Sequence, residues 1–246
     1  MKIIRREVKT ISSEYMNMDI KYSLYGHYGV NIMYFTNFSD DPLEAEKKGL
    51  ISSLEKYIKQ GKIKFICVPT LLPQTWRNPE LSMEKRSIKH KDYNDFLEGE
   101  LVPSVYMDSG QPVPLFSTGF DEGAYFALNS FFRRPDIFFG TIAFSGIYDI
   151  RHFSEEYFDE NCYFNSPVDF LPNLDDAFWL SFLHSRHHTH IITGRGKGEH
   201  PPNSKRLSDI LDKKNIQHDY TEWDENYGHD LETWDKLLEF YIGKRL

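Results

Sequence analysis

The sequence predicts an α/β fold, in which a mostly parallel β-sheet is covered by helices on both faces and has an antiparallel edge at its N-terminal end. Short segments rich in β-branched and aromatic residues alternate with segments whose apolar residues recur at helical spacing. This alternation is typical of strands joined by crossover helices. At 246 residues with 40% hydrophobic residues, the chain is long enough to bury a substantial core.

The expected elements follow in chain order. Residues 18–26 and 30–35 are expected to be two strands joined by a turn that form the antiparallel edge, the second being more buried. A helix over 43–62, ended by Gly61, precedes a strand at 63–68. Further helices are expected at 91–107, 121–132, 204–214 and 231–242, and further strands at 114–117, 138–144, 188–193 and 218–223.

Composition excludes some classes of function. A formal net charge of −8 argues against nucleic acid or an anionic membrane as the main partner, because phosphate neutralisation requires a basic surface. The two cysteines, Cys67 and Cys162, have no spacing typical of a disulfide framework or a metal knuckle. No signal peptide or membrane span is recognisable, so we expect a cytoplasmic protein that binds a small molecule and needs no cofactor. The sequence leaves open whether the protein forms a homodimer.

Two irregular segments interrupt a chain that we expect to form a single domain over 1–246. Residues 69–90 contain several prolines, and residues 149–186 are rich in aromatic residues, Asn and Pro. Long irregular segments in compact domains often serve as lids or binding loops. We therefore expect residues 149–186 to be a lid or a cap-like insertion, and we expect Trp76, Tyr157 and Phe164 to line a pocket.

The stretch "LFSTGFDEGAYFAL" predicts a buried strand, a tight turn between Gly119 and Gly123, and a helix. The pattern G-x-S-x-G at such a junction raises a nucleophilic serine onto the start of a helix, and here Asp121 stands in its place. Taken alone, the turn is more often an ordinary helix cap. Later strands are followed by "HIITGRGKGEHPP", with Glu199, and "EWDENYGHDLETW", with His229, so nucleophile, acid and histidine follow in the order of a catalytic triad.

Seven segments together resemble the esterase-D-like family of α/β-hydrolases over nearly the whole chain. They are "YGHYGVNIMYF", "GKIKFICV", "QTWRNPE", "STGFDEGAYFALNSFFRRPDIFFGTIAFSGIYDI", "NCYFNSPVDFLPNL", "TGRGKGE" and "GHDLETW". The resemblance implies an α/β-hydrolase fold and a serine esterase or acyl hydrolase. It implies a serine at position 121, a carboxylate at or near Glu199, and the catalytic histidine at His229.

This sequence departs from the family at Asp121, and no neighbouring serine replaces the missing nucleophile. The oxyanion hole would be formed by the backbone N–H groups of Glu122 and Phe38, beside two carboxylates that repel a developing oxyanion. An ionised Asp121 would also form an ion pair with His229 and raise the histidine's pKa. The sequence does not decide whether Asp121 is natural or introduced.

Two functions remain open. The first is a hydrolase-like protein, impaired or inactive as a serine esterase, that binds a ligand or acts as a scaffold. The second is an active hydrolase in which Asp121 is the covalent nucleophile, His229 the base and Glu199 the orienting acid. A metal site formed by Asp121, Glu122 and His229 is a weaker alternative, and we expect no metal.

Overall fold

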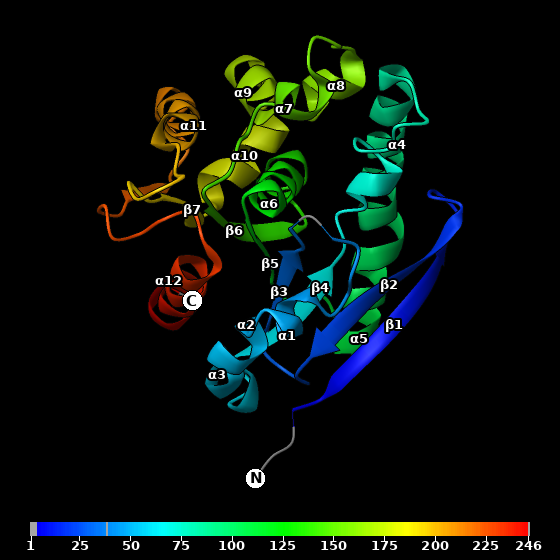
Figure 1. The fold of residues 1–246 in the computed structure, drawn as a ribbon, viewed down its shortest axis with the longest axis vertical. Coiled ribbons are helices and arrows are strands. Elements are labelled where there is room, and N and C mark those ends of the chain that lie inside the picture. The colour runs from blue at the N-terminus through cyan, green and yellow to red at the C-terminus, as the bar shows by residue number, and fades with distance from the viewer. Residues whose placement is uncertain (1–3, 38, 246) are drawn as a thin grey trace.

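The computed structural model describes residues 4–37 and 39–245. Figure 1 shows a central sheet with helices on both sides. The strands are β1 (Arg6–Ser13), β2 (Met18–Tyr25), β3 (Val30–Phe35), β4 (Ile63–Val68), β5 (Leu115–Phe120), β6 (Phe138–Phe144), β7 (His188–Thr193) and β8 (Asp219–Glu222). The helices are α1 (Glu44–Lys47), α2 (Leu50–Ser53), α3 (Glu55–Lys59), η1 (Leu72–Gln74), α4 (Met83–Phe96), η2 (Leu97–Leu101), α5 (Val102–Ser109), α6 (Glu122–Arg133), α7 (Arg151–Ser154), α8 (Glu160–Phe164), α9 (Pro167–Phe170), η3 (Leu171–Asn173), α10 (Ala177–Ser185), α11 (Pro201–Lys213) and α12 (Leu231–Arg245).

The eight strands lie in the order β1-β2-β4-β3-β5-β6-β7-β8. β1 and β2 are antiparallel to each other, β2 is antiparallel to β4, and the remaining pairs are parallel. The predicted fold class is therefore confirmed, including the antiparallel edge.

The strands that form this edge differ from the prediction. β2 pairs with β1, for which no strand was expected, whereas β3 lies between β4 and β5 in the middle of the sheet. β3 is almost wholly buried because helices cover both of its faces, and this explains its continuous apolar sequence. β1 alternates between exposed and partly exposed residues, a weaker signal that is typical of an edge.

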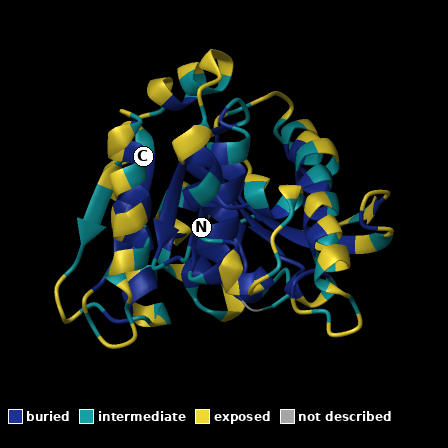
Figure 2. Cartoon of the chain, turned by 90° about the horizontal axis from the view of Figure 1, so that it is seen from above, coloured by how far each residue is buried: buried dark blue, intermediate teal, exposed yellow. Residues whose placement is uncertain are grey.

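Alternate residues of each central strand serve two separate cores. On β3, Ile32 and Tyr34 pack with α1–α3 and α12, while Met33 and Phe35 pack with α4–α6 and α11. Figure 2 shows the result, with the sheet buried and the outer sides of the helices exposed. The two-residue period of the strands thus divides the apolar residues between the two faces.

Two predicted helices have different bounds in the structure. The helix expected over 43–62 is divided into α1, α2 and α3, because Gly49 adopts a left-handed conformation with φ of 85° between the first two. The helix expected from residue 91 begins earlier, at Met83, where the Ser82 side chain accepts a hydrogen bond from the backbone N–H of Lys85. The segment 69–90 is therefore irregular only in its first part.

Residues 149–186 contain the four short helices α7–α10 and the turn η3. They lie at the top of Figure 1, where α8 packs against α4, and α9 and η3 pack against α11. Whether this segment moves as a lid stays a prediction.

A cluster of charged side chains ties the edge strands to α5. The Asp108 carboxylate accepts hydrogen bonds from Arg5, Lys9 and the buried Lys64. Lys64 is 1% exposed and lies on β4, whereas Arg5 and Lys9 belong to the N-terminal edge. One carboxylate therefore connects three parts of the chain.

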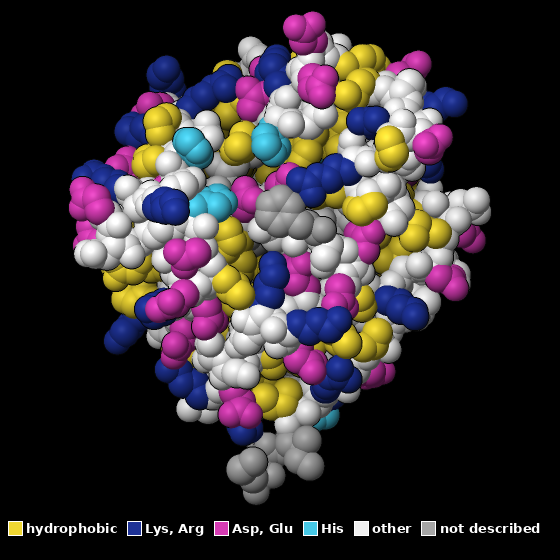
Figure 3. Space-filling model, viewed as in Figure 1, with side chains coloured by type: hydrophobic (Ala, Val, Ile, Leu, Met, Phe, Trp, Pro, Cys, Tyr) yellow, Lys and Arg dark blue, Asp and Glu magenta, His cyan; other side chains and the backbone are white. Residues whose placement is uncertain are grey.

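The surface carries charges of both signs. Figure 3 shows basic and acidic side chains interspersed over one face of the molecule. Over residues 4–37 and 39–245, no helix combines the length and the apolar character that crossing a bilayer requires.

Candidate active site

The candidate site lies where neighbouring connections leave the sheet in opposite directions. From β3 the chain passes through α1–α3 to β4 on one side, whereas from β5 it passes through α6 to β6 on the other. Ligand sites in open α/β sheets form at such a switch point, beside the carboxyl ends of the strands. Asp121 follows β5 at this edge.

Asp121 has the backbone conformation of a sharp strand-to-helix turn, with φ of 51° and ψ of −115°. A non-glycine residue rarely adopts a positive φ, and such strain persists only when the surroundings impose it. Here the Asp121 N–H donates to the Phe144 carbonyl at 2.9 Å, and its own carbonyl accepts from the N–H of Ala124 at 3.1 Å. These bonds hold the side chain at the start of α6.

Both glycines of the turn are required by close backbone contacts. A Cβ atom at Gly119 would lie 2.3 Å from the carbonyl oxygen of Gly123. A Cβ atom at Gly123 would lie 2.4 Å from the carbonyl oxygen of Phe35, at the end of β3. The spacing G-x-D-x-G is therefore explained by the approach of α6 to the ends of β5 and β3.

Glu199 and His229 reach the same place from the loops after β7 and β8. The Glu199 carboxylate is 1% exposed and accepts hydrogen bonds from Ser145 Oγ at 2.6 Å and from Thr193 Oγ1 at 2.8 Å. The His229 N–H donates to the Lys197 carbonyl at 3.0 Å, which joins the two loops. Two hydroxyl groups thus fix the acid independently of the histidine.

The His229 ring lies between two carboxylates. Its Nε2 is 3.7 Å from Asp121 Oδ1, and its Nδ1 is 3.5 Å from Glu199 Oε1, which are distances of ion pairs rather than of short hydrogen bonds. Asp121 and Glu199, in that order of effect, raise the pKa of His229 to about 9. Burial opposes ionisation of Glu199, but interactions with His229, Ser145 and Thr193 hold the pKa of Glu199 below its ordinary value. The imidazole is therefore protonated at neutral pH.

Solved structures resemble this chain over almost its whole length. A ferulic acid esterase matches with a TM-score of 0.75 and 16% identity, covering 97% of this chain and 96% of that one. An S-formylglutathione hydrolase from Agrobacterium tumefaciens matches with a TM-score of 0.72 and 12% identity, covering 98% and 95%. A ferulic acid esterase from Anaeromyces mucronatus matches with a TM-score of 0.69 and 14% identity, covering 99% and 91%. This chain has the α/β-hydrolase fold.

No protein-family model matches the chain, and no curated protein sequence matches it. At identities of 12–16%, the structural likeness shows the fold only, and the chemistry of the site is argued from the residues of this chain.

The oxyanion hole was expected between the loop after β3 and the start of α6. Glu122 is the first residue of α6, where backbone N–H groups have no acceptor within the helix. Phe38, which was expected to supply the second N–H group, lies outside the described residues. The backbone N–H of Asn37 donates to the Glu44 carboxylate at 2.7 Å, so its hydrogen bond is already made within the protein.

The Glu122 side chain belongs to a charged pair beside the turn. Its carboxylate is 5% exposed and forms an ion pair with Arg77, and His152 Nε2 lies 3.5 Å from the same oxygen. The other oxygen, Oε2, is buried without a hydrogen-bond partner among the residues that the structure describes. The expected repulsion from this second acid is thus offset by Arg77.

The three aromatic residues expected to line a common pocket are in different surroundings. Trp76 is buried in the core, where its Nε1 donates to His90 at 2.8 Å. Tyr157 donates its hydroxyl to Asp159 at 3.0 Å. Phe164 lines a cavity that none of Asp121, Glu199 and His229 lines. Their role in ligand binding stays a prediction.

Sequence reasoning did not identify several residues that support the site. Ser145 has a positive φ of 55°, donates to Glu199 and accepts a hydrogen bond from Trp234 Nε1 at 3.2 Å. Trp234 also presents its ring to the His229 ring, with centroids 4.7 Å apart. The signal for Ser145 was its place directly after β6, beside the end of β5. Within residues 4–37 and 39–245, no group of three or more His, Cys, Asp and Glu side chains is arranged to hold a metal ion.

Proposed function

We propose that this protein is an esterase-like α/β-hydrolase whose altered site binds a small-molecule ligand without cleaving it by the serine-esterase route. The observation that carries the proposal is the Asp121 carboxylate at the strained apex, 3.7 Å from the His229 ring. An ester hydrolase of this fold needs a hydroxyl nucleophile and a neutral imidazole that accepts its proton. The carboxylate lacks that proton, and a histidine with a pKa of about 9 lacks the free lone pair.

The fold supports the proposal because the ferulic acid esterases and the S-formylglutathione hydrolase have the same architecture over nearly their whole length. The proposal is also supported by the positions of Glu199 and His229, since the His229 ring lies 3.5 Å from Glu199 and 3.7 Å from Asp121 at the turn. A ligand at this place would meet the Asp121 carboxylate and the His229 imidazole, whose side chains are 17% and 27% exposed, with the protonated ring as a donor.

The test compares hydrolysis of 4-nitrophenyl acetate by the native protein, Asp121→Ser and the double variant Asp121→Ser/His229→Ala. We expect no native turnover above buffer, and a gain of about a hundredfold or more with Asp121→Ser. Serine supplies a hydroxyl nucleophile and removes the carboxylate that keeps His229 protonated, so the histidine can act as a neutral base. The double variant should lack this increase in turnover, which distinguishes hydrolysis that depends on His229 from hydrolysis by other groups on the protein surface. Native turnover that requires His229 would contradict the proposal.

One observation favours a second function, an active hydrolase with Asp121 as nucleophile. The Asp121 carboxylate is 17% exposed, so a substrate can reach it. An oxygen of Asp121 would attack an electrophilic carbon of the substrate and expel the leaving group, giving an ester that water then hydrolyses. Formation of that ester removes the negative charge of Asp121, the larger cause of the raised histidine pKa, and so restores His229 as a base toward water.

This second function is tested by a substrate screen followed by turnover of any hit in ¹⁸O-labelled water. Water attack on the ester carbonyl leaves a labelled oxygen in the Asp121 carboxylate, which peptide mass spectrometry detects. Asp121→Asn should abolish both turnover and label. Turnover without label at Asp121 would exclude the covalent route.

A further inference from the structure

A cavity of about 410 Å³ lies between the C-terminal end of α6, α4 and the segment α8–α10. Its volume lies within the range of roughly 300–1,000 Å³ that is typical of small-molecule sites. Most of its wall is apolar, and this part is formed by Phe132, Phe164, Phe170, Leu174 and Trp179. Such a wall suits a ligand with a flat ring or another apolar body.

This cavity is separate from the candidate active site. α6 begins at Glu122, beside Asp121, and ends at Arg133, which lines the cavity. At about 1.5 Å per residue, the two ends of this helix are roughly 17 Å apart. Two different ligands can therefore occupy the two places.

Arg133 offers an unused hydrogen-bond donor at the cavity. Its Nη1 donates to the Phe164 carbonyl at 3.1 Å, and its Nη2 lies 3.6 Å from Glu98. Its Nε is buried and has no hydrogen-bond partner among the described residues. The 3.6 Å between Nη2 and Glu98 is too long for a hydrogen bond, so the guanidinium keeps a donor that an acceptor on a ligand can use.

The charges around the cavity favour an anionic acceptor. Lys91, Arg133 and Arg134 line it, together with a single carboxylate, Asp95. Lys91 is paired with Asp95 at 2.6 Å, and Arg134 is paired with Glu98 at 2.6 Å. Arg133 has the longest of these ion pairs, and it is therefore the guanidinium most available to a bound carboxylate.

The wall of the cavity is held in place by buried hydrogen bonds. The side chain of Asn165, which lines the cavity, accepts from the side-chain amides of Asn94 and Asn129, both at 2.8 Å. Its backbone carbonyl accepts from the Tyr125 hydroxyl at 2.6 Å. These contacts fix α8 against α4 and α6, so a ligand would not have to order this part of the wall.

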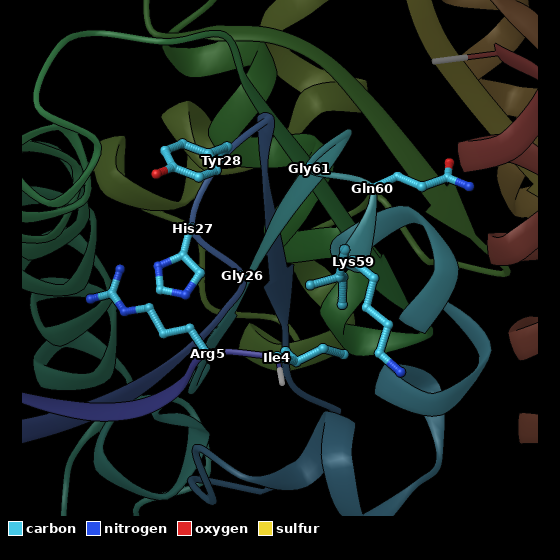
Figure 4. Close-up of a pocket in the computed structure, with 9 residues that line it drawn as sticks. Ile4, Arg5, Gly26, His27, Tyr28, Lys59, Gln60 and Gly61 are labelled. Atoms are coloured by element: carbon cyan, nitrogen blue, oxygen red, sulfur yellow. The ribbon is translucent and has the colours of Figure 1, made fainter. Parts of the chain in front are cut away.

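A second cavity, of about 400 Å³, lacks these features (Figure 4). It lies beside Gly26 and Gly61, where Figure 4 shows Lys59 and Gln60 directed away from Arg5 and His27. Arg5 is paired with Asp108, and Lys59 is paired with Glu55 at 2.7 Å. The cations at this cavity are therefore already neutralised, so we place the ligand at the α6–α10 cavity.

We propose that the cavity at the C-terminal end of α6 is a binding site for a small aromatic carboxylate. The ring lies between Phe164 and Trp179, and the carboxylate accepts a hydrogen bond from the Nη2 group of Arg133. The site is independent of the function proposed for Asp121.

The experiment titrates the full-length protein with 2-naphthoate and, as a neutral probe of the same shape, with 2-naphthamide, by isothermal calorimetry. We expect one naphthoate site. Arg133→Met should weaken naphthoate by about tenfold or more, and the amide by much less, because the lost hydrogen bond is to a charged group. Phe164→Ala should weaken both probes. Arg6→Met, which removes an exposed arginine of the distant β1 edge, should change neither.

Two controls establish that the losses of affinity arise at this cavity. Asp121→Ser should leave naphthoate affinity unchanged, and far-UV circular dichroism should show that Arg133→Met and Phe164→Ala remain folded. Arg133→Lys keeps the charge but not the planar guanidinium, so it should recover only part of the affinity. The proposal is overturned if naphthoate does not bind, if Arg133→Met and Phe164→Ala bind it as the native protein does, or if binding requires Asp121.

Discussion

His229 has a different proton-binding behaviour from the histidine of a serine triad, because it lies between Asp121 and Glu199. A serine triad presents one carboxylate and one neutral hydroxyl to its histidine. Here carboxylates lie on both sides of the ring, and the imidazole becomes the central cation of a three-residue ion pair. The carboxylate at position 121 thus affects the charge of a residue that is distant in the sequence.

This charge predicts how stability depends on pH. The pKa of His229 is raised from 6.5 to about 9, so the stabilising contribution is complete below pH 6.5 and is lost as the pH rises through about 9. The free energy of unfolding of the native protein, minus that of His229→Gln, should fall by roughly 1–3 kcal/mol over this range, allowing for solvent screening. Urea unfolding at several pH values measures the difference. Asp121→Asn should remove most of the dependence, and an unchanged slope in that variant would contradict the assignment.

Arg77 connects two elements, because it follows η1 and pairs with Glu122 in the first turn of α6. The Glu122 carboxylate is almost fully buried, so removal of its cationic partner leaves a desolvated charge. Arg77→Met should therefore lower the free energy of unfolding by roughly 1–3 kcal/mol. Adding Glu122→Gln should recover part of the loss, which a double-mutant cycle measures.

Arg195→Met is the matched control for this pair. Arg195 forms an ion pair with Glu222, but its side chain is 57% exposed, so its removal should destabilise the protein much less than removal of Arg77. Equal losses for Arg77→Met and Arg195→Met would show that burial of Glu122 is unimportant.

The elements that sequence predicted well are those with strong local signals. β4 and β6 have the predicted bounds, because both segments are rich in β-branched and aromatic residues. β1 was missed because an edge strand buries little, and its alternation is weak. α4 was expected to begin too late because its first residues are almost all polar, although Ser82 provides a cap.

The sequence predicted the order of the candidate site residues along the chain, but it did not predict the contacts that their side chains make. The carboxyl ends of parallel strands meet at one edge, so residues after β5, β7 and β8 were expected to come together. The hydroxyl of Ser145 on Glu199 and the pairing of Arg77 with Glu122 depend on tertiary packing and have no periodic signal. These supporting contacts can be identified only in the three-dimensional structure.

At the scale of the whole molecule, Asp108 holds the antiparallel edge to the parallel part of the sheet. Burial raises its pKa, but hydrogen bonds from Arg5, Lys64 and Lys9 outweigh this effect and hold the pKa of Asp108 well below its ordinary value of 3.8. The resulting stabilisation is present above pH 3.8 and is lost as the pH falls below it. Loss of this stabilisation should therefore contribute to acid unfolding below pH 3.8.

Asp108→Asn should lower the free energy of unfolding at neutral pH by about 3 kcal/mol, because it leaves the buried Lys64 without a counter-charge. It should also make acid unfolding less steep. Glu239→Gln, which breaks the exposed pair with Lys56, is the control and should change stability by less than about 1 kcal/mol. Unfolding followed by circular dichroism between neutral and acidic pH tests both statements, and equal effects of the two variants would refute them.

The backbone around Asp121 is imposed by its neighbours: Gly119, Gly123 and the carbonyl of Phe144 fix the turn, and none of these contacts involves the side chain at position 121. Any side chain introduced there will project to the same point beside the His229 ring. A cysteine at this position would present a thiol to an imidazole and the start of a helix, and would accept spectroscopic labels selectively, since Cys67 and Cys162 are buried. The turn thus offers a fixed attachment point from which the surroundings of the His229 ring can be followed in solution.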